Sequence, residues 1–287
     1  MPAIALIAVL LAACTHATWN LVAKRAADSR YFVWLYSIGS LLVWSPAVAW
    51  VLWTTRPNFG ALQWVAVGAT GILHLAYSLG LQAGYRAADL SVVYPVARGS
   101  GPLLSFVGAA ILLGERPGPL AILGLALVVL GIVLVAGLAR KLPRGSARGF
   151  RWGLITGSCV AAYTLNDGWA VKVLAISPIL LDYAGNSFRA LVLTRWAIRD
   201  RPRLAAEIRE YARPALVVSV LGPLGYILVL FAMKVAPVSH VAPARELATL
   251  LGTYLGARML NEPASGARLA GALCIVGGVV SLALSSG

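Results

Sequence analysis

Six ionisable side chains lie inside long apolar stretches of this sequence, where little water is available to solvate a charge. At the centre of a membrane helix, an Arg or Asp costs roughly 2.5–3.5 kcal/mol. Such residues therefore normally face a polar cavity or a partner of opposite charge, and they mark places where binding or proton transfer could occur. The six are Arg98, Asp167, Asp182, Arg189, Arg245 and Glu246.

Arg98 and Arg245 differ from the other four because they occupy equivalent places in an internal repeat. Each follows a proline by two or three residues, and proline opens a gap in the hydrogen-bond ladder of a helix. One interpretation is an arginine near a central cavity that attracts the carboxylate of an amino acid. The other is an arginine that pairs across the interface between two halves, with Asp167 or Asp182 as its partner.

Polar aromatic side chains give a second indication of a binding site. His16 and Trp19 lie one helical turn apart, as do His74 and Tyr77. Their rings could line a pocket and stack on an apolar or aromatic substrate, although packing between helices would need the same residues. The candidate substrate-binding residues are His16, Trp19, Asn20, His74, Tyr77, Tyr94, Arg98, Tyr163, Asp167, Tyr226, His240 and Arg245.

Catalytic, metal and nucleotide motifs are not found in the sequence. The three cysteines are isolated, without metal-ligand or disulfide spacing, and no Gly-x-x-x-x-Gly-Lys-Ser/Thr phosphate loop occurs. We therefore expect no cofactor, no metal and no ATP-driven step. Proton coupling would need a buried carboxylate or histidine, and a passive facilitator is equally compatible with the sequence. Glu115 and Glu262 each end an apolar stretch beside Arg or Pro, which favours a helix-end role.

Composition indicates a membrane protein. Hydrophobic residues make up 60% of the chain and charged residues 12%, whereas soluble domains carry about 25% charge. The 287 residues accommodate about ten spans of roughly 20 residues each. The polar segment 200–213 is expected to be an exposed loop or a short surface helix. The expected spans are 3–23, 32–54, 61–83, 90–113, 119–138, 151–171, 177–194, 214–233, 238–260 and 266–285.

The sequence repeats itself with a displacement of about 147 residues. Five spans per repeat is an odd number, so the second copy must begin on the opposite face of the membrane. Inverted repeats are typical of secondary transporters, whose substrate site lies between the halves. We therefore predict an all-α fold of ten transmembrane helices in two inverted five-helix repeats around a central cavity, with repeats at 1–138 and 151–287 and a basic linker at 139–150. The matching positions are Arg98 and Arg245, Glu115 and Glu262, Gly124 and Gly271, Gly131 and Gly278, Lys24 and Lys172, and Tyr77 and Tyr226.

Three short motifs carry a family resemblance over essentially the whole chain: Trp19-Asn20 with Lys24, the residues Leu-Leu-Gly-Glu-Arg at 112–116, and Leu-Asn-Glu-Pro at 260–263. The sequence resembles the EamA-like, ten-helix branch of the drug/metabolite transporter superfamily, although Asn261 replaces the usual glycine. The resemblance implies a bacterial inner-membrane carrier that exports amino acids or related metabolites, with aromatic-amino-acid exporters as the nearest candidates. It implies a small-molecule substrate and the lipid bilayer as partners, and it allows a monomer.

Basic residues predict the orientation. Lys and Arg favour cytoplasmic loops, and 17 of them lie on one side of the expected topology against four on the other. This places the loops at 139–150 and 195–213 in the cytoplasm and both termini in the periplasm. The net charge of +14 is thus explained by loops, without a nucleic-acid partner.

Other function classes remain as alternatives. A multidrug or cationic-compound exporter would need a carboxylate that dominates the cavity. A non-transport intramembrane enzyme would need a catalytic motif, and we expect no enzymatic activity. A scaffold would have little use for so many buried charges.

Overall fold

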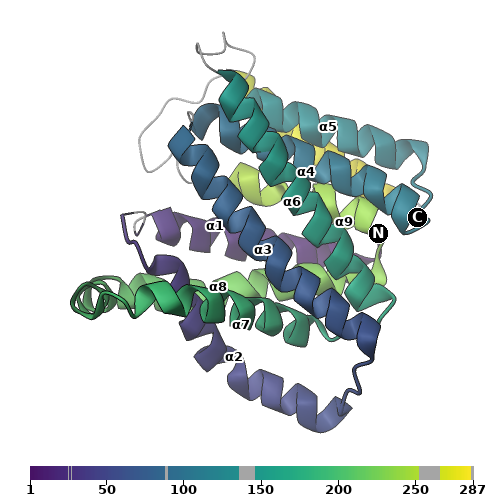
Figure 1. Cartoon of the computed structure of the whole chain (residues 1–287). Helices are drawn as coiled ribbons and strands as arrows, with labels where there is room; N and C mark the ends of the chain where they lie inside the picture. Colours follow the sequence, from purple (N-terminus) through teal and green to yellow (C-terminus); the bar gives the residue numbers. More distant parts are fainter. Residues whose placement is uncertain (25, 27, 88–89, 136–145, 252–265, 286–287) are drawn as a thin grey trace.

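The computed structural model describes residues 1–287 except 25, 27, 88–89, 136–145, 252–265 and 286–287 (Figure 1). Helices make up this part of the chain, and it contains no strand. The two termini lie at the same end of the molecule, where the Met1 ammonium donates to the Ala283 carbonyl at 2.7 Å. The helices are α1 Ala3–Lys24, α2 Phe32–Thr55, α3 Ala61–Ala87, α4 Leu90–Leu112, α5 Pro119–Val135, α6 Ser146–Lys172, α7 Pro178–Ala197, α8 Arg201–Val235, α9 Val238–Ala244 and α11 Gly266–Leu284.

Several of these helices fit a multi-pass membrane protein. Four are long and apolar enough to cross a bilayer, namely α1, α2, α3 and α8, and the apolar segments Val96–Leu112, Pro119–Val135 and Leu269–Leu284 are shorter. Large apolar side chains also cover the outside, as for Trp53, which is 73% exposed. An exterior of this kind is stable in lipid and would be an aggregation hazard in water.

The segment at 200–213 is neither a loop nor a separate surface helix. It is the first part of α8, which continues into the apolar span past Pro214. Asp200 caps this helix by accepting from the Arg203 amide at 3.2 Å, and Arg203 pairs with Glu207 one turn further on at 3.1 Å. Capping and i,i+4 pairing stabilise a polar helix that has little apolar surface to bury. Likewise, α6 begins at Ser146, inside the stretch that we expected to be a linker.

The ninth expected span is not one continuous helix in its described part. α9 ends at Ala244, residues 245–246 form a turn, and residues 247–251 are helical again. Pro243 lacks the N–H that would bond to the preceding turn. The ladder then tightens: the Glu246 amide donates to the Pro243 carbonyl at 3.0 Å and the Thr249 amide to the Glu246 carbonyl at 2.9 Å. This break carries Arg245 and Glu246 to the centre of the molecule.

Helices of the first half pack against helices of the second half, in pairs that would be interchanged by swapping the halves. α1 packs on α8 and α6 packs on α3, while α2 contacts α7 and α5 contacts α11. α2 and α8 also meet at Pro223, which leaves the Ser219 carbonyl without its helical donor. The Trp44 indole donates to this carbonyl at 3.2 Å. Trp44 therefore forms a hydrogen bond between the two helices.

Four glycines bring α5 and α11 into backbone contact. A Cβ built at Gly131 would lie 2.6 Å from the Gly271 carbonyl oxygen, and one at Gly278 would lie 2.6 Å from the Gly124 carbonyl oxygen. Small residues allow such close approach between membrane helices. In the repeat, Gly124 corresponds to Gly271 and Gly131 to Gly278, so exchanging the two halves maps one contact onto the other.

Replacing Gly131 with Ala is expected to destabilise the protein by about 1–3 kcal/mol, because the added methyl group overlaps a backbone carbonyl that cannot rotate away. The free energy of unfolding in an SDS titration of the micellar protein measures this. Gly68→Ala is the matched control, since a Cβ there meets nothing within 4 Å. Equal stability of the two variants would contradict the close packing of α5 and α11.

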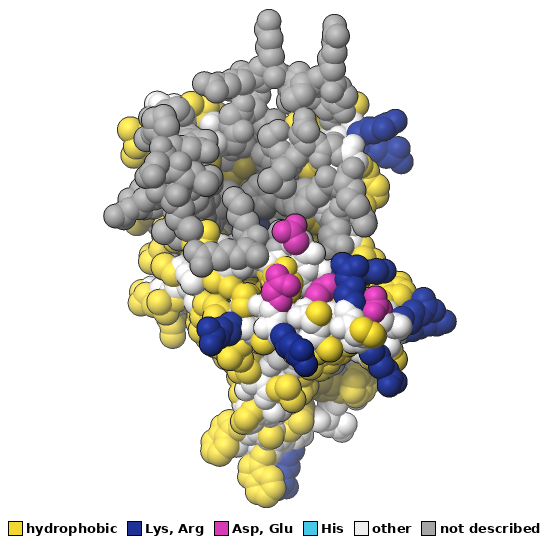
Figure 2. Space-filling view, turned by 90° about the vertical axis from the view of Figure 1, so that its left-hand side faces the viewer, with side chains coloured by type: hydrophobic (Ala, Val, Ile, Leu, Met, Phe, Trp, Pro, Cys, Tyr) yellow, Lys and Arg dark blue, Asp and Glu magenta, His cyan; other side chains and the backbone are white. Residues whose placement is uncertain are grey.

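The end of the molecule opposite the termini carries most of the described basic side chains (Figure 2). The first turns of α8 project there and contribute Arg201, Arg203 and Arg209. Glu207 connects α8 to the segment between α1 and α2, because its carboxylate accepts from the Ser29 hydroxyl at 2.6 Å and from the Tyr31 amide at 2.9 Å. The bilayer-facing flanks and this basic end together delimit the interior that holds the candidate site.

Candidate functional site

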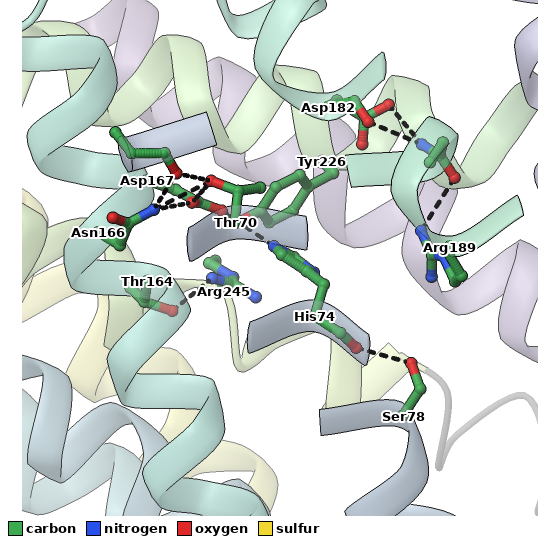
Figure 3. Close-up of polar contacts among 12 residues, drawn as sticks. Thr70, His74, Ser78, Thr164, Asn166, Asp167, Asp182, Arg189, Tyr226 and Arg245 are labelled. Carbon is green, nitrogen blue, oxygen red and sulfur yellow. Dashed lines mark hydrogen bonds and ion pairs between the residues drawn. The ribbon is translucent and has the colours of Figure 1, made fainter. Parts of the chain in front are cut away.

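The centre of the site is Asp167 on α6, whose side chain is fully buried. Thr70 donates to its Oδ1 at 2.6 Å and Tyr226 to its Oδ2 at 2.5 Å. His74 lies 2.9 Å from Oδ2 through its Nε2, and Asn166 donates to Oδ1 at 3.0 Å. A buried carboxylate normally requires such partners. Three helices, α3, α6 and α8, therefore meet at one carboxylate (Figure 3).

Helical spacing explains why these side chains converge. Thr70 and His74 are four residues apart on α3, and Tyr163 and Asp167 are four apart on α6, so each pair shares one face. The His74 ring stacks on Tyr163 with a centroid distance of 4.2 Å and meets Tyr226 edge-on at 5.1 Å. Tyr77 meets Tyr163 edge-on at 5.7 Å. The result is an aromatic cluster around a polar core.

Arg245 joins this cluster from the break after α9. Its guanidinium carbon lies 5.9 Å from the centroid of the Tyr226 ring, and its Nη1 is 3.4 Å from the Thr164 hydroxyl. Within the described ranges, Arg245 makes no salt bridge with a carboxylate. A guanidinium that has no carboxylate partner can bind an anion.

Arg98, the repeat equivalent of Arg245, has a different environment. Its Nη2 lies 2.9 Å from Glu246 Oε2, and both side chains are largely buried. Thr249 completes the contact: Arg98 donates to its hydroxyl at 2.9 Å, and that hydroxyl donates to Glu246 at 2.9 Å. Arg98 therefore pairs between the halves, as one of our two interpretations had it, but with Glu246 in place of Asp167 or Asp182.

A second polar group lies on α7, beside the central cluster. Asn186 donates to Asp182 at 2.9 Å and accepts from Arg189 at 2.9 Å, so the amide separates the two charges. A cavity of about 10 Å³ is enclosed by these charged residues together with Thr70, His74, Gly185 and Tyr226. This is about the space that one water molecule needs, and it is far below the volume of an amino acid.

The remaining predicted site residues lie outside the hydrogen-bonded cluster around Asp167, although His16 lies near Arg98 and Arg245. His16 and Trp19 contact each other edge-on at 4.9 Å, and Trp19 packs against the apolar cluster around Phe32 and Val218. Asn20 is exposed and donates to the His16 carbonyl at 2.9 Å. His240 is buried at the start of α9, where its Nδ1 lies 3.3 Å from the Ser239 hydroxyl. The side chain of Tyr94 lies outside the described residues.

Glu115 has the helix-end role that its position predicted. Its two carboxylate oxygens accept from the first backbone amides of α9, those of Val238 at 2.7 Å and Ser239 at 2.9 Å. Lys172 lies 3.5 Å from the same carboxylate. This contact joins the end of α4 to the second half on the side of the termini. Glu262 is outside the described residues.

Four residues of the site were missing from our sequence-based set: Thr70, Asn166, Asp182 and Arg189. Thr70 could have been found because it lies one turn before His74 on the same face of the helix. Asp182 and Arg189 were noted as buried charges, but the sequence did not connect them with each other or with His74. Their place beside His74 follows only from the packing of α7 against α3.

Comparisons with known proteins agree with this picture of the fold. Residues 3–137 match the family model of the EamA-like transporter family, which is consistent with the drug/metabolite transporter superfamily and indicates a membrane transporter. No curated protein matches the chain. A solved crystal structure of another protein is similar to it with a TM-score of 0.73, covering 98% of this chain and 98% of that chain at 17% identity. At this identity the likeness shows the fold alone.

Proposed function

We propose that this protein is a secondary carrier of the bacterial inner membrane that exports amino acids, the aromatic ones foremost, and related small metabolites by alternating access. The observation that carries the proposal is the central cluster. It places a guanidinium without a salt bridge, a buried carboxylate and three aromatic rings where the two halves meet. These groups match the carboxylate, the ammonium and the apolar side chain of an amino acid.

The architecture behind the proposal is two inverted repeats, residues 1–138 and 151–287. The exchanged helix pairs support it, because α1 on α8 and α6 on α3 are the same contact once the halves are swapped. The reciprocal glycine contacts of α5 and α11 support it in the same way. Inverted-repeat carriers bind substrate between their halves. The cavity beside the cluster holds about one water, so the halves must separate before a substrate can enter.

Counterflow in proteoliposomes tests the function. Vesicles loaded with one unlabelled amino acid should transiently accumulate the same labelled amino acid from outside, because a carrier exchanges the two without an energy source. The panel should contain aromatic, aliphatic and basic amino acids, and protein-free vesicles are the control. Absence of counterflow for every compound in the panel would refute the amino-acid assignment.

An exporter of cationic compounds is the second candidate, because the buried carboxylates of Asp167 and Asp182 would attract a cation. Organic cations without a carboxylate belong in the same panel. Exchange of these cations with no exchange of amino acids would favour this candidate, and it would assign Arg245 a structural role.

The orientation is tested separately by cysteine labelling. We expect residues 139–150 and 195–213 to be cytoplasmic, since they carry 10 of the 17 Lys and Arg residues counted on that side. In a background without native cysteines, Asn58→Cys should react with an impermeant maleimide in intact cells, and Gly145→Cys should react only after permeabilisation. The reverse pattern would place both termini in the cytoplasm.

A further inference from the structure

We propose that His74, Asp167 and Asp182 form a proton-transfer site that couples export to proton entry; this rests on the proposed carrier function. His74 is central because it contacts the Asp167 carboxylate directly and lines the same small cavity as Asp182. Its Nε2 lies 2.9 Å from Asp167 Oδ2, and its ring lines the small cavity that Asp182 also lines. A histidine between two buried carboxylates is the arrangement that proton relays in membrane proteins use.

The small cavity can connect His74 to Asp182 through a bound water molecule. Its volume suits one water molecule, and five of the six residues that line it carry polar side chains. Arg189 also lines it, and the Arg189 Nε is buried without a hydrogen-bond partner among the described residues. Buried donors of this kind normally find an acceptor. A water oxygen in the cavity would accept from Arg189 and connect the Asp182 carboxylate to the His74 ring.

The charges that face His74 come from every neighbouring helix. α6 contributes Asp167 and the Tyr163 phenol, α8 contributes the Tyr226 phenol, and α7 contributes Asp182 and Arg189. The break after α9 adds Arg245, whereas Arg98 of α4 is already neutralised by Glu246. With a neutral His74 ring, the two carboxylates balance the two free guanidinium groups. One added proton gives one net positive charge.

This balance makes a proton and a substrate ammonium group compete. Both are attracted by the Asp167 carboxylate, and one carboxylate cannot neutralise both, so a protonated His74 ring and a substrate ammonium group would repel each other in a buried site. In the proton-bound state, the extra proton resides on the His74 ring, which faces the ionised Asp167 carboxylate. In the substrate-bound state, the His74 ring is neutral and the substrate ammonium group takes the place of the proton. Only N–H and O–H bonds form and break, and each cycle moves one proton inward and one substrate outward.

A pH gradient across proteoliposomes tests the coupling on the wild-type protein. Using an amino acid identified by counterflow, a gradient with the acidic side facing the periplasmic face should drive its accumulation there against its own gradient. Asp167→Asn and His74→Gln should lower this driven accumulation relative to counterflow by at least about tenfold. Asp167→Asn removes the carboxylate that stabilises the proton, and His74→Gln removes the ring that carries it. The matched control Asp28→Asn changes an exposed carboxylate of a loop and should leave driven accumulation unchanged. Counterflow without any effect of the pH gradient on the wild-type protein would overturn the coupling and leave the carrier function intact.

A second measurement does not depend on the substrate. The chain has three histidines, so ¹⁵N-histidine labelling gives a simple spectrum, and the His74 signals are those absent from His74→Gln. They should change when the pH is lowered and the ring takes up a proton. Ring signals that stay constant at every pH at which the protein remains folded would overturn the proton site, even if counterflow fails for every amino acid and the proposed function falls with it.

Discussion

Arg245→Gln is expected to lower amino-acid counterflow about tenfold to hundredfold, the loss that follows from removing a charge-assisted hydrogen bond to the substrate carboxylate. Arg245 is the guanidinium of the central cluster that has no salt bridge in the described part of the chain. Its neighbours there are the Thr164 hydroxyl at 3.4 Å and the Tyr226 ring. A substrate carboxylate would therefore meet a charge that is not already neutralised.

The choice of substrate separates binding from structural support. Amino-acid amides lack the carboxylate, so their exchange should fall much less in Arg245→Gln than the exchange of the parent amino acids. Arg209→Gln makes the same change at an exposed position of α8 and should have no effect. An equal loss for acids and amides, together with a poor yield of folded protein, would mean that Arg245 holds the halves together.

Arg98→Gln is expected to act on stability and to cost about 3–5 kcal/mol, because it leaves the buried Glu246 carboxylate without its cation. The two side chains are 12% and 5% exposed, so water cannot replace the lost partner. The double variant Arg98→Gln/Glu246→Gln should recover most of this loss, since two amides can bond to each other and no charge remains. The free energy of unfolding from an SDS titration gives all three values.

The pair formed by Arg203 and Glu207 is the matched control for this experiment. It is also an Arg–Glu contact, but Arg203 is 51% exposed and the two residues are adjacent on one helix. Arg203→Gln should therefore cost less than about 1 kcal/mol. A loss at Arg98 as small as the loss at Arg203 would contradict the assignment of Arg98–Glu246 as the bond that joins the halves.

Much of the fold could be predicted because it depends on local sequence. Apolar length predicted the helices, and their observed bounds differ by a few residues in most cases. The helix-end role of Glu115 was also predictable, since an acidic residue at the end of an apolar stretch can accept from the free amides at the start of a helix. The errors at 200–213 and at 245–246 arose where capping and a proline outweighed the hydrophobic pattern.

The sequence by itself predicted a helical membrane protein with a repeat in which Arg98 and Arg245 are equivalent. It also contains a difference between them, because Glu246 follows Arg245 while Gly99 follows Arg98. The sequence thus places a carboxylate directly beside only one of the two arginines. Only the tertiary structure decided that this carboxylate forms its ion pair with Arg98. The physical reason is distance: ion pairs form within a few ångströms, and packing alone determines which helices come that close.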